Sequence, residues 1–309
     1  MNRIHLNMKG LLVKGTAMVA LTTLAVACSD EDTPAVSYEN PATFFQPADT
    51  DTTATARLRR DFFQKTGSFL LFNDTLQHRF LGYDAGGDAQ YFNETVDLTY
   101  NVGQSSPATN TYVYTYITSP KEQQTVVQFL NDYILNHMTN RMRPYSFFLA
   151  RLITGYDSNT GKVTLRPYSM SNQRCTAIAC NYLLLRDRSD AQKQNFAQTV
   201  LYAMVGQMAQ NNISSFNTFF SYSSQYYNAD YSEAGVGTVN NDVMRRLGFL
   251  GSSTGSALFP SRETDLNAYV VQTLQYSESQ IATLYAGNEV VLNKFAEVRR
   301  VLIELGYKF

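Results

Sequence analysis

The spacing of apolar and polar positions divides the chain into strand-like and helix-like segments. Apolar positions three to four residues apart predict helices, whereas alternation and short apolar runs predict strands. Strands are predicted at 68–72, 91–100, 112–118, 147–153, 162–168 and 178–185. Helices are predicted at 55–65, 120–138, 190–210, 240–247, 263–275, 278–286 and 289–305. This order predicts an α+β fold with a small sheet, two long central helices and a helical C-terminal region from about residue 238.

Local signals mark where several of these elements begin and end. Ser119, followed by Pro120 and by Glu122, is typical of a capped helix start. Ser189 with Gln192 three residues later predicts a second capping box. The turn formers of 157–161 predict a hairpin between two strands. Four glycines follow predicted helices as C-caps: Gly67, Gly248, Gly287 and Gly306.

The N-terminus carries the features of an export signal. Arg3, Lys9 and Lys14 precede the apolar segment 15–27, which is shorter than the roughly 20 residues of a membrane span. We therefore expect a signal peptide over residues 1–27. The small residues Ala25 and Ala27 precede Cys28. This pattern resembles a bacterial lipobox and implies lipidation of Cys28 and a membrane anchor. The alternative is an ordinary cleaved signal with an incidental cysteine.

The residues after Cys28 are acidic and then polar. The run Ser29-Asp30-Glu31-Asp32 resembles the signal that directs Bacteroidetes lipoproteins to the outer face of the outer membrane. The rest of the segment 28–53 is weakly patterned and contains prolines, which is typical of a flexible tether. The folded domain is accordingly predicted at 54–309, on the cell exterior.

Composition narrows the classes of partner. Without residues 1–27, three of the 25 basic residues are lost and 22 face 26 acidic ones, so a nucleic acid partner is not expected. The chain has 21 Tyr and 19 Phe but no Trp, which argues against an indole platform for glycans. Cys175 and Cys180 allow two interpretations: a small disulfide loop in an oxidising compartment, or two buried thiols beside the apolar residues 176–179.

The long helix at 190–210 carries a family resemblance. Together with Leu247-Gly248-Phe249, the run 263–266 and the final helix at 295–306, it resembles the Bacteroidetes substrate import-associated zinc metallohydrolases, a family of zinc-binding metallopeptidase lipoproteins. The resemblance implies a zincin-like fold and an H-E-x-x-H motif on the long helix, where two histidines bind zinc and the glutamate activates water.

The residues that this motif requires are absent from the chain. Aligned on the helix, the two histidine positions fall on Tyr202 and Gly206, the glutamate position falls on Ala203, and the downstream acidic ligand falls near Ala268. Residues 194–229 contain no Asp, Glu, Lys, Arg or His. We therefore expect no catalytic residue, no metal site and no cofactor. Gly206 is expected to persist because another element packs closely against it.

The three histidines do not restore a site. His5 belongs to the signal peptide, and His78 and His137 are far apart and lack a partner one helical turn away. His137 lies on the apolar face of its helix and is predicted to be a core or boundary residue. A dinucleotide fingerprint and a nucleophile elbow are also missing from the sequence.

One neutral segment, 213–227, is rich in aromatic residues and allows two interpretations. Its aromatic composition is typical of a partner or peptide interface. Alternatively, its Phe residues fill the core while its Tyr residues lie at the rim. The candidate binding residues are Phe216, Phe219, Tyr222, Tyr226 and Tyr227.

These observations together predict an inactive, metallopeptidase-like accessory subunit of a Sus-type nutrient import system. The resemblance implies SusC/SusD-type partners, a TonB-dependent channel and a lid protein, with a peptide or glycan as ligand. Two alternatives stay open: an active peptidase or glycosidase with an unrecognised site, and a stand-alone adhesive or structural surface protein.

Overall fold

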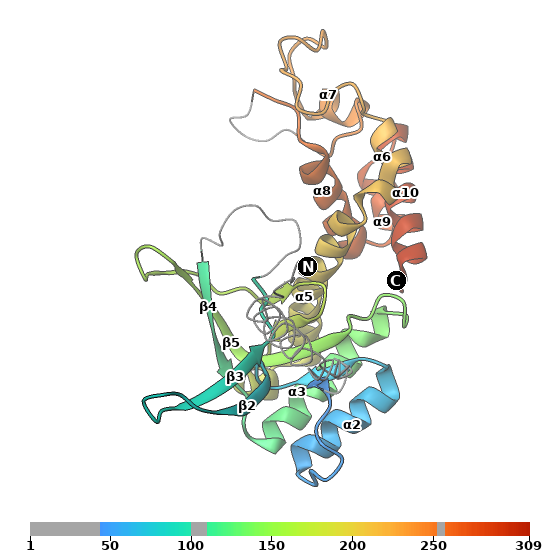
Figure 1. The fold of residues 1–309 in the computed structure, drawn as a ribbon. Coiled ribbons are helices and arrows are strands. Elements are labelled where there is room, and N and C mark those ends of the chain that lie inside the picture. The colour runs from blue at the N-terminus through green and yellow to red at the C-terminus, as the bar shows by residue number, and fades with distance from the viewer. Residues whose placement is uncertain (1–43, 100–109, 252–256) are drawn as a thin grey trace, which may run out of the picture. The chain divides into compact units, whose positions relative to one another are not determined.

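The computed structural model describes residues 44–99, 110–251 and 257–309. The chain divides into two units, Met1–Asn40 and Pro41–Phe309, and every described residue belongs to the second. The predicted signal peptide, Cys28 and residues 29–43 of the predicted tether lie outside the described residues. The second unit combines a sheet with helices, which confirms the α+β class (Figure 1).

A long central strand, β5 (Ser146–Asp157), organises the main sheet. Its first half pairs in parallel with β1 and β8, and its second half pairs antiparallel with β4 and β6. The strand β7, at the end of the sheet beyond β8, pairs antiparallel with β8. The bounds of these strands are Phe69–Leu71 for β1, Asn110–Tyr116 for β4, Val163–Leu165 for β6, Ser169–Ser171 for β7 and Thr176–Ala179 for β8.

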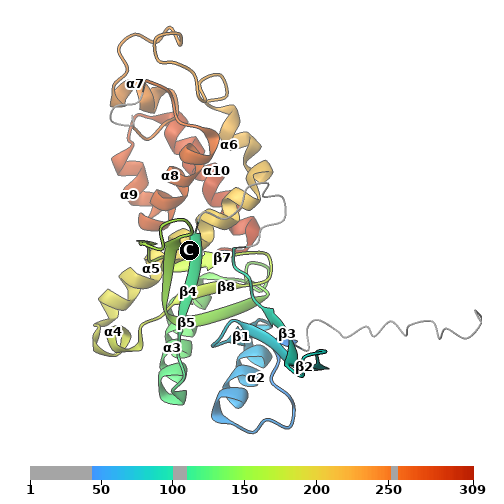
Figure 2. The ribbon, with the colours of Figure 1, turned by 60° about the vertical axis from the view of Figure 1, so that its left-hand side comes forward.

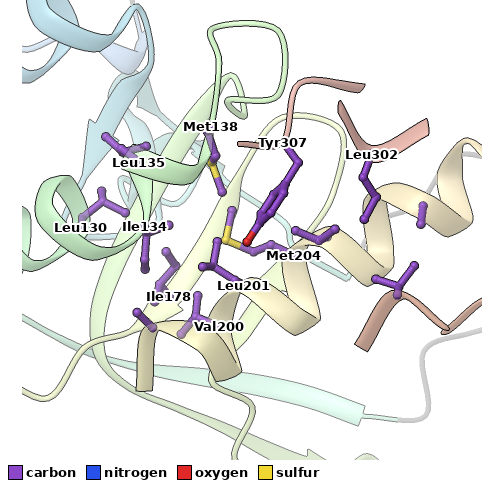
Figure 3. Close-up of a cluster of buried hydrophobic side chains, with 14 of the residues drawn as sticks. Leu130, Ile134, Leu135, Met138, Ile178, Val200, Leu201, Met204, Leu302 and Tyr307 are labelled. Carbon is purple, nitrogen blue, oxygen red and sulfur yellow. The ribbon is translucent and has the colours of Figure 1, made fainter. Parts of the chain in front are cut away.

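The strands β1 and β8 and the first half of β5 are buried on both faces of the sheet, and their successive residues point to opposite sides. On one side Leu70, Phe147 and Ile178 join a large core with the helices. Figure 3 shows Ile178 beside Val200, Leu201 and Met204, with Leu130 and Ile134 across from them. On the other side a smaller cluster is formed by Phe69, Leu71, Phe148, Ala150, Ala177 and Phe45.

The burial of Phe45 corrects the predicted start of the folded domain. This side chain is 1 % exposed, and its ring packs against Tyr145 with centroids 5.1 Å apart. Arg59 also donates a hydrogen bond of 2.8 Å to the Phe45 carbonyl oxygen. The folded part therefore begins at or before Phe45, and the tether predicted as 28–53 is shorter at its C-terminal end.

The helices α2 (Ala54–Thr66) and α5 (Asp190–Asn211) lie close to their predicted bounds. The helix α3 (Pro120–Tyr133) begins as predicted but ends five residues before the predicted end at 138, where a 3₁₀ turn follows. Gly67 ends α2 with a φ of 74°, a conformation that favours glycine. The predicted capping box of α3 is wrong: the Ser119 side chain makes no cap hydrogen bond, and Glu122 forms an ion pair with Arg151 instead.

The predicted strand at 178–185 is wrong in its second half. The strand β8 ends at Ala179, and α4 (Tyr182–Asp187) follows at once. The Asn181 side chain accepts a hydrogen bond of 3.0 Å from the Leu183 backbone N–H, so Asn181 is an N-cap. The apolar run of this segment thus divides between two elements.

The helical C-terminal part begins earlier than predicted, directly after α5 rather than near residue 238. A 3₁₀ turn, η3 (Ile213–Phe216), leads into α6 (Asn217–Ser221). The other helices of this part pack around α10 (Figure 2), and α8 also runs along α5, where Gln198 and Gln210 donate hydrogen bonds to the Leu274 and Glu263 carbonyl oxygens. Their bounds are Asn241–Arg246 for α7, Arg262–Gln275 for α8, Glu278–Leu284 for α9 and Glu289–Leu305 for α10.

A second, two-stranded sheet projects to one side of the main sheet (Figure 1). It is a hairpin of β2 (Thr75–Tyr83) and β3 (Ala89–Thr95). The segment β3 overlaps the predicted strand at 91–100, of which Tyr100 lies outside the described residues. The sequence pattern did not predict β2.

Candidate functional site

The helix α5 holds the positions where the family resemblance places its zinc motif. Ser189 and Gln192 form the predicted capping box at its start. Tyr202 is half-buried, Ala203 is exposed and Gly206 is buried. None of these three side chains can bind zinc or accept a proton from water near neutral pH.

The position of the second motif histidine is closed by α8. A Cβ atom added at Gly206 would lie 3.2 Å from Oδ1 of Asn267, which is shorter than an ordinary van der Waals contact. This close approach confirms the expected packing role of Gly206. A histidine at this position would require α8 to move or Asn267 to change its rotamer.

A buried ion pair lies three residues before the expected acidic position at Ala268. Asp265 on α8 and Lys294 on α10 are 2 % and 0 % exposed, and their Oδ2 and Nζ atoms are 2.6 Å apart. The ammonium of Lys294 also donates to Oγ of Ser223 at 3.1 Å and to the Tyr227 hydroxyl at 3.2 Å. Tyr227 in turn donates to Asp265 at 2.7 Å.

Burial opposes the charged forms in this network. It raises the pKa of Asp265 and lowers the pKa of Lys294, while the attraction between the two groups acts against both changes. Aromatic rings enclose the ammonium, with the Phe219 centroid 4.2 Å and the Tyr269 centroid 4.9 Å from Nζ. The network therefore joins α8, α10 and the segment after α5. Because both charges are shielded from solvent, a substrate cannot reach them.

The other ionisable groups do not form a metal centre. Within residues 44–99, 110–251 and 257–309, there is no group of three His, Cys, Asp or Glu side chains that could hold a metal ion. His78 stacks on Tyr91 in the β2–β3 hairpin, and His137 stacks on Tyr307 near the C-terminus. His137 is half-buried, as expected of a boundary residue.

Cys175 and Cys180 are both free, buried thiols, so the structure does not contain the disulfide loop. They flank β8, and Cys175 belongs to the smaller core while Cys180 belongs to the larger one. Residues five apart along an extended strand point to opposite faces, which explains why the two sulfurs do not meet. Burial raises the pKa of each thiol to about 12.

The aromatic segment 213–227 follows the second of its two interpretations. Phe216 and Phe219 are fully buried, so they cannot form part of a partner surface, and this part of the binding prediction is wrong. Tyr226 and Tyr227 are half-buried, and Tyr227 belongs to the Asp265–Lys294 network. Tyr222, 40 % exposed, lies at the rim.

The exposed aromatic residues gather instead on the β2–β3 hairpin, which we call the aromatic hairpin (Thr75–Thr95). Five of its large apolar side chains are 41–73 % exposed: Phe80, Leu81, Tyr83, Tyr91 and Phe92. The Phe80 ring is in contact with the rings of Tyr83 and Tyr91, and clustered exposed apolar side chains often mark an interaction surface. Sequence reasoning missed this surface, although its five apolar residues lie within 13 positions of one another.

The aromatic hairpin is internally ordered. The Phe80 ring meets Tyr91 and Tyr83 at centroid distances of 5.5 and 5.1 Å. At the tip, the Asp84 carboxylate accepts hydrogen bonds from the backbone N–H groups of Gly86 and Asp88, each 2.9 Å long. Among the described strands, β2 and β3 pair only with each other.

A polar cleft lies where the end of α3 and the 3₁₀ turn η2 (Leu135–His137) face the first half of α5. Its volume is about 470 Å³, within the usual range for ligand sites. Amide, carboxylate and aromatic side chains supply most of its lining. The lining residues are Asp132, Tyr133, Asn136, His137, Gln194, Asn195, Ala197, Gln198, Leu201, Leu274 and Tyr307.

Comparison with known proteins gives no relative for this chain. No protein-family model matches it, and no curated protein and no solved structure shows significant similarity to it. Every helix within the described residues is too short or too polar to cross a membrane.

Proposed function

We propose that this protein is a catalytically inactive, metallopeptidase-like lipoprotein that serves as an accessory subunit of a Sus-type nutrient import system. Its fold is a zincin-like one whose metal site has been lost. Lipid on Cys28 anchors the protein to the outer membrane, and the folded domain faces the cell exterior. It binds a TonB-dependent channel, its lid protein or the imported substrate, and cleaves nothing.

The packing of α8 against Gly206 carries the proposal that hydrolysis has been lost. A metallopeptidase needs a groove beside the motif helix, but the side chain of Asn267 occupies the space that the second histidine would take. The absence of Asp, Glu and His from 194–229 removes the other ligands and the base. A remaining role is therefore one of binding.

The aromatic hairpin supplies the surface for a protein partner. Tyr, Phe and Arg are the residues that contribute most to binding at protein interfaces, and Arg79 already lies over the Phe92 ring at 5.8 Å. The exposed rings belong to both faces of a two-stranded hairpin. A partner that surrounds the hairpin can contact both faces, whereas a flat partner surface can contact only one. A channel or lid protein with an apolar recess fits this requirement.

Co-purification from native membranes tests the proposal. We expect the tagged protein to remain in the membrane, to carry no stoichiometric zinc by elemental analysis, and to bring with it a TonB-dependent channel identified by mass spectrometry. The variant Phe80→Ser/Tyr91→Ser should lose the channel but keep its membrane attachment.

The matched control is Tyr222→Ser/Leu284→Ser, which removes two apolar side chains that are also 40–52 % exposed but lie outside the hairpin. This control should retain the channel. One tightly bound zinc per chain would refute the loss of the metal site, and retention of the channel by the hairpin variant would refute the docking surface. A Cys28→Ala protein that stays in the membrane would refute the anchor.

A further inference from the structure

The polar cleft has hydrogen-bonding groups that the protein itself leaves unused. The side-chain amides of Gln194 and Asn195 and the carboxylate of Asp132 line the cleft, and none of them hydrogen-bonds to another described side chain or backbone group. The side-chain amides of Asn136 and Gln198 each donate one hydrogen bond to a backbone carbonyl, so their oxygen atoms are left for a ligand. The cleft thus offers both donors and acceptors.

His137 is held in a defined orientation at the edge of the cleft. Its Nδ1 atom lies 3.0 Å from the Lys308 carbonyl oxygen. A carbonyl oxygen only accepts hydrogen bonds, so Nδ1 carries the proton and Nε2 of the neutral ring is an acceptor. The ring is stacked on Tyr307 with an interplanar angle of 13°, which limits its rotation.

The charge in the lining of the cleft disfavours an anionic ligand. Its lining contains Asp132 but no Lys or Arg. A second carboxylate, Asp190, accepts a hydrogen bond of 2.9 Å from the Tyr133 hydroxyl at the cleft wall, and this contact raises the pKa of Tyr133. Asp190 is itself paired with Lys193, whose Nζ lies 3.8 Å from Oδ1 of Asp190, so the charge in the lining of the cleft is that of Asp132, which repels a phosphate or carboxylate ligand.

We propose that the polar cleft is a binding site for a neutral saccharide. A sugar hydroxyl group can donate one hydrogen bond and accept others at the same time. The side-chain amides of the cleft also offer both functions, and His137 Nε2 and the Asp132 carboxylate are further acceptors. The half-buried rings of Tyr133 and His137 supply flat surface for the C–H face of a sugar, and the buried Tyr307 ring supports His137 from behind. An extended peptide would need apolar side-chain pockets, and the aliphatic lining is limited to Ala197, Leu201 and Leu274.

The test uses the full mature chain made soluble by Cys28→Ser, because saccharide binding at this cleft requires neither the lipid anchor nor a channel. Maltohexaose, cellohexaose, mannohexaose and xylohexaose are titrated by calorimetry and by nuclear magnetic resonance. Hexagalacturonate is the anionic comparator, and a hexapeptide of alanine and serine is the peptide comparator. We expect at least one neutral hexasaccharide to bind, and neither comparator to bind.

The variant Gln194→Ala/Asn195→Ala should weaken that binding by about tenfold, a change of about 1.4 kcal/mol in binding free energy. Its matched control is Gln207→Ala/Asn211→Ala, which removes two exposed amides of the same helix outside the cleft, and which should leave the affinity unchanged. Both variants should keep the unfolding midpoint of the parent protein.

Three results would overturn the saccharide site. The first is that no neutral hexasaccharide binds up to a concentration of about 10 mM, where even contacts weaker than 1 mM are visible. The second is that the peptide or hexagalacturonate binds and the cleft variant abolishes this binding. The third is that the cleft and control variants bind a saccharide equally well, which would place its site elsewhere. None of these results bears on the zinc content or on the channel, so they leave the proposed function intact.

Discussion

Removing the buried lysine should destabilise the protein more than any other single charge deletion in its helical part. In Lys294→Met the side chain keeps a similar length but loses its ammonium. Asp265, 2 % exposed, then keeps only the 2.7 Å hydrogen bond from Tyr227. An unpaired buried carboxylate is costly, so we expect a loss of about 3–5 kcal/mol in the free energy of unfolding.

A second substitution separates the ion pair from simple packing. In Asp265→Leu/Lys294→Met both charges are gone, and the remaining defect is the Tyr227 hydroxyl without its acceptor. Leaving one polar group unpaired costs about 1–3 kcal/mol, so the double variant should be more stable than Lys294→Met alone. The control Lys193→Met breaks an exposed pair with Asp190, whose atoms are 3.8 Å apart, and should cost at most about 1 kcal/mol.

Urea unfolding of the soluble Cys28→Ser form measures these differences. Since the chain contains no Trp and 21 Tyr, tyrosine fluorescence and circular dichroism are the suitable probes, and coincident transitions justify a two-state treatment. The reasoning would be refuted by a Lys294→Met loss below that of Lys193→Met. It would also be refuted if Asp265→Leu/Lys294→Met were less stable than Lys294→Met alone.

Three further outcomes are expected. Burial raises the pKa of Cys175 and Cys180 from 9.0 to about 12, so their contribution to stability is complete below pH 9 and is lost as the pH rises towards 12. The variant Cys175→Ala/Cys180→Ala should therefore show a smaller fall of the unfolding midpoint between pH 9 and pH 12 than the parent protein. Parallel pH profiles of the two proteins would contradict this. Tyr202→His/Ala203→Glu/Gly206→His should lose about 1–3 kcal/mol through overpacking against Asn267 and bind no zinc by elemental analysis. Tyr227→Ala should lower the melting temperature measurably more than Tyr222→Ala, and equal losses would contradict the buried role of Tyr227.

The sequence predicted those elements whose signals are local. The Ser189–Gln192 capping box and the Gly67 C-cap depend on residues within one helical turn, and both lie where the sequence places them. Asn181 gave an equally local N-cap signal for α4. The apolar run 182–185 concealed it, because a short apolar run does not distinguish a strand from a helix.

The candidate surfaces were harder to predict, because burial depends on distant residues. Phe219 is aromatic in the same way as Phe80, but only Phe219 is enclosed by Lys294 and Tyr269, which follow it by 75 and 50 positions. The segment β2 has no buried face, so it lacks the alternation by which strands are recognised. The polar cleft combines residues from 132 to 307, a set that no spacing along the chain indicates.

The motif position on α5 differs from the aromatic hairpin and the polar cleft in how far its side chains are exposed, and this difference supports the proposed role in binding. Where the resemblance places its motif on α5, the structure is closed: Gly206 is in close contact with Asn267, and the Asp265–Lys294 pair is buried. On the aromatic hairpin and in the polar cleft, by contrast, aromatic rings and amides are exposed to solvent, and clustered exposed apolar groups often mark a binding surface. The proposed role in binding therefore rests on these two surfaces, and the proposed loss of catalysis rests on the closed position at Gly206.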